Sequence, residues 1–155
     1  MKTIKISTTL FILFILSSCL TAGLEDLPVY EEAEITNFKF EYRWAEKEGI
    51  SDVLRVKPLN TELSINGDKQ EVRCKIIVPP ADAQRFTETV RNNVMIDNIV
   101  GYASISTAAS IKPLGNAPVL GIPGDFSQQT MHYEVIAADQ KTKKTWSLII
   151  ESFDK

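Results

Sequence analysis

Few residues of this chain could carry out catalysis, and they do not form a catalytic pattern. His132 is the only histidine, and it stands in an alternating segment beside Tyr133. A lone histidine can neither complete a zinc site nor act as a general base without a nucleophile and an orienting acid. The sequence contains no Gly-x-Ser-x-Gly elbow, no phosphate-binding Gly-Lys-Ser/Thr loop and no Asp-x-Asp-x-Asp calcium spacing. We therefore expect a non-enzymatic protein with no catalytic residues, no metal ligands and no cofactor.

Cys19 is the residue whose surroundings most clearly predict a modification. Lys2 and Lys5 precede a short apolar run, which ends at Ser17-Ser18-Cys19. A basic start, a short apolar stretch and small residues before a processing point are typical of a secretory signal. The apolar run, residues 8–16, is too short to span a bilayer, which needs about 20 apolar residues.

The ending Leu16-Ser17-Ser18-Cys19 resembles a bacterial lipobox. That resemblance implies cleavage of residues 1–18 and lipidation of Cys19 by a diacylglycerol group and usually an N-acyl chain such as palmitate. Two or more chains give stable anchoring, whereas one holds a protein only marginally. We therefore expect a lipoprotein held at the bacterial outer membrane, with residues 19–33 as a tether. The side of the membrane that it faces stays open.

The bulk composition predicts one globular domain, residues 34–155, after the tether. Removing residues 1–18 leaves 137 residues and moves the formal charge from −3 to about −5. An acidic chain is a poor partner for nucleic acid, so we expect none. Lipidation of Cys19 would leave Cys74 as the only thiol, on the same alternate face as Val72 and Ile76. We interpret Cys74 as a buried core residue rather than a reactive one.

Aromatic side chains are the remaining candidates for ligand contact. Sugar rings stack on exposed tryptophan and tyrosine because the apolar face of the sugar complements the aromatic face. Trp44 is the main candidate, since it ends a strand pattern beside charged Glu46 and Lys47. Tyr42, Tyr102 and Trp146 are also candidates, but core packing explains each of them as well, and Trp146 better than stacking.

Alternation of apolar and polar residues predicts an all-β protein. The segments with strand character are 35–44, 52–57, 62–65, 71–78, 95–106, 131–137 and 145–153. Asn66-Gly67 predicts a tight hairpin turn, and the many prolines and glycines of residues 113–124 predict a long surface loop. Residues 81–93 fit either one short helix capped by Asp82 or a loop.

About seven short strands and at most one short helix describe an antiparallel β-sandwich, with a β-barrel as the alternative. The expected core consists of Phe38, Phe40, Cys74, Ile76, Val78, Val135, Leu148 and Ile150.

The C-terminal half resembles the immunoglobulin-like domains of Bacteroidetes surface lipoproteins. The similarity rests on Asp125-Phe126-Ser127, on the strand 133–139 and on the strand 144–150, and it covers roughly residues 34–153. Gln140 departs from the pattern, because glycine is usual at that turn position. The insert at residues 85–98 is also longer than usual in these domains.

The resemblance implies an immunoglobulin-like sandwich that serves as a spacer, an adhesin or an accessory part of a glycan-uptake system. The partner would then be a polysaccharide or another envelope protein. The alternative is a purely structural or adhesive module that contacts proteins only.

Overall fold

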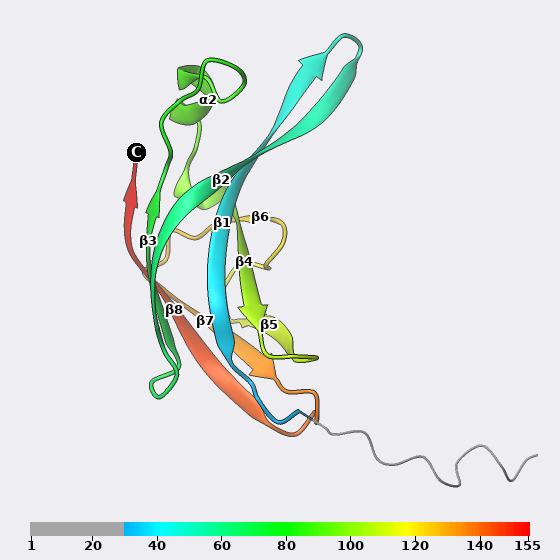
Figure 1. The fold of residues 1–155 in the computed structure, drawn as a ribbon, viewed down its shortest axis with the longest axis vertical. Coiled ribbons are helices and arrows are strands. Elements are labelled where there is room, and N and C mark those ends of the chain that lie inside the picture. The colour runs from blue at the N-terminus through cyan, green and yellow to red at the C-terminus, as the bar shows by residue number, and fades with distance from the viewer. Residues whose placement is uncertain (1–29) are drawn as a thin grey trace, which may run out of the picture.

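A computed structural model describes residues 30–155 and shows one mixed sheet of eight strands that curls into a half-barrel (Figure 1). The strands are β1 (Ile35–Glu48), β2 (Ser51–Asn66), β3 (Glu71–Ile77), β4 (Ile99–Ile105), β5 (Ser110–Leu114), β6 (Pro123–Gly124), β7 (Thr130–Ile136) and β8 (Lys143–Asp154). They lie in the order β5-β7-β8-β3-β2-β1-β4-β6. In the described part of the chain, helix is confined to the single turns α2 (Glu88–Asn92) and η1 (Ile96–Asn98). Within residues 30–155 no helix has the length and apolar character needed to cross a membrane.

The all-β class is confirmed, but the sheet is neither seven-stranded nor wholly antiparallel. The central strands β3 and β8 run parallel, with Val72 opposite Leu148, while every other pair is antiparallel. The ladders of β1, β4 and β6 are joined to those of β3, β8, β7 and β5 through β2, which is long enough to pair with two neighbours in succession. An immunoglobulin-like sandwich of seven strands is therefore not confirmed.

β2 pairs with β1 from Ser51 to Leu59 and with β3 from Asn60 to Asn66. The sequence predicted two strands here, because Pro58 was expected to end the first. Pro58 instead lies inside β2, at a point where the strand has β1 on one side and no strand on the other. Proline is tolerated on such an edge, since no neighbour requires its missing N–H. The β1–β2 hairpin therefore extends beyond the body of the domain (Figure 1).

The core lies on the concave side of the curl, and all eight predicted core residues are buried. Phe38 of β1 packs near Tyr133 of β7, with ring centroids 6.3 Å apart, so the two halves of the sheet face one another across the core. Cys74 is 1% exposed, as expected, and burial raises the pKa of its thiol to about 12. The thiol is therefore a core group and not a nucleophile.

The connections follow the sequence predictions in part. The hairpin after Asn66 forms, but its loop has four residues, and Gln70 rather than Gly67 adopts a positive φ. The insert contains a short helix, α2, whose N-cap is Thr87 and not Asp82. Gln140 in place of the usual glycine suggested a turn of another type, but Gln140 itself has φ +60, the conformation for which glycine is usual.

Candidate ligand groove beside Trp44

A groove of about 470 Å³ lies between the projecting β1–β2 hairpin and the loop before α2. Its lining residues are Trp44, Leu54, Arg55, Val56, Lys57, Asp82, Gln84, Arg85 and Phe86. Four of these are consecutive in β2, so the groove follows the strand. Trp44, the ligand contact predicted from the sequence, lines this groove, which is larger than the second hollow on the outer face of the sheet.

Trp44 forms one aromatic wall of the groove and is half-buried. Alternation places it on the inner face of β1, with Phe40 and Tyr42. One side of its ring stacks on Tyr42, with centroids 5.8 Å apart and planes at 15°. Phe86 packs against it at 5.9 Å in a tilted arrangement. These two contacts fix the indole and leave only part of it for a ligand.

Asp82 holds the loop that forms the opposite wall. Its Oδ1 accepts hydrogen bonds from the backbone N–H groups of Gln84, Arg85 and Phe86, at 2.9–3.1 Å. Its Oδ2 accepts a bond of 2.9 Å from Lys57 Nζ. The Lys57 bond and then the backbone donors lower the pKa of the Asp82 carboxyl well below its ordinary value. Of the two alternatives for this segment, a helix capped by Asp82 or a loop, the loop is the one that forms around Asp82, and Asp82 ties it to β2.

The charged groups at the groove are paired along the hairpin. The guanidinium of Arg55 donates to Glu46 at 2.6 Å and also to Glu48. Arg85 lies 3.5 Å from Glu48, so it connects the loop to the hairpin a second time. Lys57 Nζ also lies 5.0 Å from the centre of the Phe86 ring, within cation–π range. On the inner side of the groove, the side chains of Arg55, Lys57 and Arg85 thus surround the aromatic rings of the lining.

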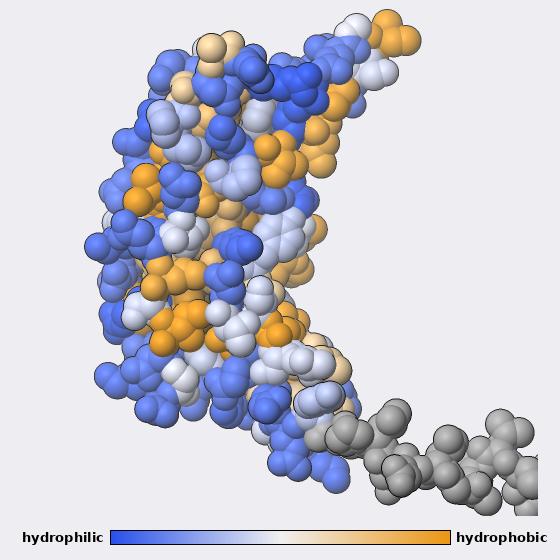
Figure 2. Space-filling view, in the orientation of Figure 1, coloured by the Kyte–Doolittle hydropathy of each residue, from blue (hydrophilic) through white to orange (hydrophobic). Residues whose placement is uncertain are grey.

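The backbone edge of β2 at residues 52–58, called here the open edge, borders the groove. Within residues 30–155 no strand pairs with it, because the ladder with β3 begins only at Asn60. On the outer face beside this edge, Leu54 and Val56 are 63% and 46% exposed, and Ile50 at the turn is fully exposed. Figure 2 shows this hydrophobic surface at the tip of the hairpin and along its side.

The other predicted candidates lie elsewhere. Trp146 is fully buried and belongs to the core, as expected. Tyr102 accepts from Arg43 and donates to Glu41 at 2.8 Å, on the outer face of β1 and β4. Arg43 also reaches Gly121 in the 113–124 loop, at 3.3 Å. Since Arg43 and Trp44 point to opposite faces of β1, that loop and Trp44 do not share one groove.

His132 is exposed on β7, with its Nδ1 3.2 Å from Ser147 Oγ, as its place in the strand predicted. Among residues 30–155 no group of three or more His, Cys, Asp and Glu side chains could hold a metal ion. Cys19, the predicted lipidation site, and residues 1–29 generally lie outside the described part of the chain.

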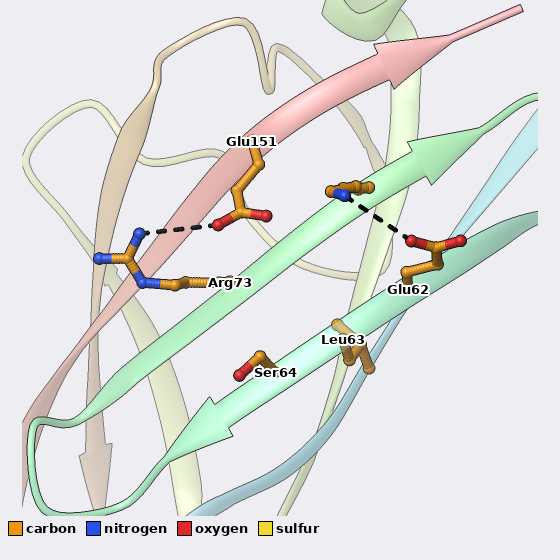
Figure 3. Close-up of a pocket in the computed structure, with 6 residues that line it drawn as sticks. Glu62, Leu63, Ser64, Arg73 and Glu151 are labelled. Atoms are coloured by element: carbon orange, nitrogen blue, oxygen red, sulfur yellow. Dashed lines mark ion pairs between the residues drawn. The ribbon is translucent and has the colours of Figure 1, made fainter.

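A second, smaller hollow of about 190 Å³ lies on the outer face of β2, β3 and β8 (Figure 3). Arg73 lies 3.6 Å from Glu151, and Lys75 lies 4.0 Å from Glu62 across the strands. These exposed ion pairs satisfy one another and add little to stability. The hollow has no aromatic or buried polar group with which to recognise a ligand, so the groove beside Trp44 is the better candidate.

Sequence reasoning found Trp44 but missed the parts of the groove that β2 and the loop at residues 82–86 contribute. The contribution of residues 82–86 depends on their tertiary position against β2, which no local pattern reveals. Pro58 was a signal for the open edge, because a proline inside a strand pattern marks an edge.

The comparisons with known proteins agree with the fold. The DUF5018-related family model matches residues 35–149. A crystal structure of a predicted secreted protein from Bacteroides fragilis is similar, with a TM-score of 0.73 and 33% sequence identity over 83% of this chain and 100% of that one. The search of curated proteins gave no match.

Proposed function

We propose that this chain, which belongs to the DUF5018-related family, is a non-enzymatic lipoprotein of the bacterial cell envelope that presents the groove beside Trp44 to a partner. The groove carries the proposal, because it combines aromatic surface, cations and a backbone edge on a rigid β-scaffold. The secreted relative from Bacteroides fragilis and the signal pattern of residues 1–19 support a place outside the cytoplasm.

Lipidation at Cys19 would hold the protein at the outer membrane. Replacing Cys19 by alanine removes the acceptor thiol, so Cys19→Ala should release the protein from membranes or leave its signal uncleaved. Membrane fractionation and mass spectrometry of the N-terminus distinguish these results from normal processing. Membrane retention of Cys19→Ala after normal processing would contradict the anchor.

A polysaccharide is the first candidate ligand, as for an accessory component of glycan uptake. The partly open indole of Trp44 offers a stacking surface, and Gln84 and Arg85 offer hydrogen-bonding groups near it. A glycan array or affinity gel should then detect binding that falls about tenfold or more in Trp44→Ala. Trp44→Phe, which keeps an aromatic ring against Phe86, is the matched control. If no glycan of a broad panel binds, a polysaccharide ligand is excluded.

A protein partner is the second candidate, and two observations favour it. The open edge leaves backbone groups of β2 unpaired, and exposed Leu54 and Val56 lie beside that edge. An unpaired strand edge is a template for another strand. A structural or adhesive module would use such a surface without any sugar.

A further inference from the structure

We propose that the hairpin tip, which is the turn Gly49-Ile50 with Leu54 and Val56 beside it, is a second membrane contact. It would touch the bilayer that holds the lipid of Cys19, at the boundary between headgroups and acyl chains. The occupant is a lipid surface without net charge. This deepens the membrane-anchored form of the proposed function and rests on it.

The hairpin tip exposes apolar side chains that the core does not use. Ile50 is fully exposed, although it lies in a two-residue turn, where glycine and polar residues are usual. Leu54 and Val56 follow on the outer face of β2, and both are exposed. Figure 2 shows that the hydrophobic surface covers the end of the hairpin and continues along its side. An exposed apolar surface on a projecting element favours contact with another apolar phase.

The charges around the hairpin tip cancel, which favours a lipid surface without net charge. Three acidic and three basic residues lie there, namely Glu46, Glu48, Asp52, Lys47, Arg55 and Arg85. Arg55 donates to Glu46 and Glu48, and Arg85 lies 3.5 Å from Glu48. Lys47 lies opposite Asp52 in the ladder. Because neither sign is in excess, a bilayer is not repelled and anionic lipid is not required.

The anchor and the hairpin tip can reach one bilayer together. The described chain begins on the side of the domain toward which the hairpin projects (Figure 1). The 14 residues of β1 separate these two points by about 45 Å along the strand. The chain from Cys19 to Ala33 spans at most about 50 Å when extended. The tether is therefore long enough for the lipid to enter the bilayer while the hairpin tip touches the same surface.

A tether makes even a weak membrane contact effective. It converts the contact into an intramolecular one, at an effective concentration on the order of 1 mM. A few apolar side chains then hold the hairpin at the bilayer, although they would bind a free protein only weakly. The open edge limits the depth, because unpaired backbone groups are not tolerated in the hydrocarbon. Ile50 therefore enters the acyl boundary, while residues 52–58 stay at the level of the headgroups.

The test uses residues 19–155, which include the whole described fold and omit the apolar run of residues 8–16. This chain is coupled through the Cys19 thiol to a maleimide lipid in phosphatidylcholine vesicles. Cys74 is buried, so coupling occurs at Cys19. Chemical coupling replaces natural lipidation, so the result does not depend on how Cys19→Ala fractionates. Failure of the anchor and failure of the tip contact are therefore distinguishable.

A tryptophan at the hairpin tip reports its contact with lipid. Ile50→Trp is made in a Trp44→Phe background, and the vesicles contain brominated phosphatidylcholine, which quenches indoles that contact its acyl chains. Lys75→Trp, at an exposed position on the outer face of β3, is the matched control. Quenching should be at least about threefold stronger for Ile50→Trp than for Lys75→Trp, because only the hairpin tip reaches the acyl boundary. Equal quenching of the two indoles would overturn the proposal.

A polar residue at position 54 tests whether apolar contact holds the hairpin tip. Leu54→Asn, added to the Ile50→Trp chain, should reduce the quenching by about half or more, whereas Leu54→Met should leave it nearly unchanged. A tenfold rise in salt should also leave it nearly unchanged, because the tip has no net charge. Equal quenching with Leu54→Asn and Leu54→Met, or loss of quenching in high salt, would refute apolar contact. If the uncoupled chain instead shields the introduced indole from iodide as its own concentration rises, the tip binds a second copy and the proposal is wrong.

Discussion

The indole N–H of Trp146 donates a buried hydrogen bond of 2.9 Å to the carbonyl of Ala33. The bond joins β8, the last strand, to the segment just before β1. Both residues are fully buried, so the bond is shielded from water. Trp146→Phe would leave this carbonyl unpaired and a small void beside it, and it should lower the free energy of unfolding by about 2–4 kcal/mol.

Urea denaturation followed by circular dichroism measures this loss. Trp44→Phe is the control, because the half-buried indole of Trp44 makes no hydrogen bond among the described residues. A loss as large in Trp44→Phe as in Trp146→Phe would show that the hydrogen bond to Ala33 contributes little.

Cys74 should resist thiol reagents in the native protein. Its side chain is buried in the hydrophobic core, and its pKa of about 12 leaves almost no thiolate at pH 8. Labelling with a disulfide reagent should follow the rate of global unfolding as urea is added. A Ser110→Cys variant, with a thiol at an exposed position of β5, should react at once. Rapid labelling of Cys74 in the native state would place it at the surface.

Asp82 should make stability sensitive to acid. Its pKa is lowered in the folded state, so its charged form stabilises the fold above the ordinary aspartate pKa, and this contribution disappears as the pH falls through the folded-state value. Unfolding free energies measured from about pH 5 down to pH 2 should therefore fall less in Asp82→Asn than in the wild type. Asp68→Asn, in the exposed turn after β2, is the control and should leave the wild-type slope. Identical slopes for wild type and Asp82→Asn would contradict the ties to Lys57 and the loop.

Gly101 should not tolerate a side chain. A Cβ at this position in β4 would lie 2.7 Å from the Phe126 ring and 3.1 Å from the Phe38 ring. Both rings are buried and cannot move away without disturbing the core, so Gly101→Ala should destabilise the domain by about 1–3 kcal/mol. Gly67→Ala is the matched control, because its nearest neighbour would be 3.7 Å away. Thermal denaturation of both variants measures the effect. If Gly101→Ala leaves the stability of the domain unchanged, β4 can shift to make room for the side chain.

Local patterns in the sequence predicted most of the strands and the core. Phe38 and Phe40 alternate with polar residues, and the structure buries both. Gln140 was identified as an unusual turn residue, and its positive φ explains why glycine is usual there. These features depend on neighbours in the chain, which a single sequence shows directly.

Features that depend on distant neighbours could not be predicted. The continuity of β2 through Pro58 follows from the exchange of one partner strand for another at Asn60. The parallel pairing of β3 with β8 joins residues 76 positions apart, such as Glu71 and Ser147. The groove needs Phe86 to meet Trp44 across 42 positions of sequence, so only its Trp44 side carried a local signal.

The parallel ladder at the centre of the sheet also affects when the protein can fold. Glu71 lies opposite Ser147, and β8 is the last strand to be synthesised. The middle of the sheet therefore cannot be completed before residues 143–154 are available, and contacts of such long sequence separation form slowly.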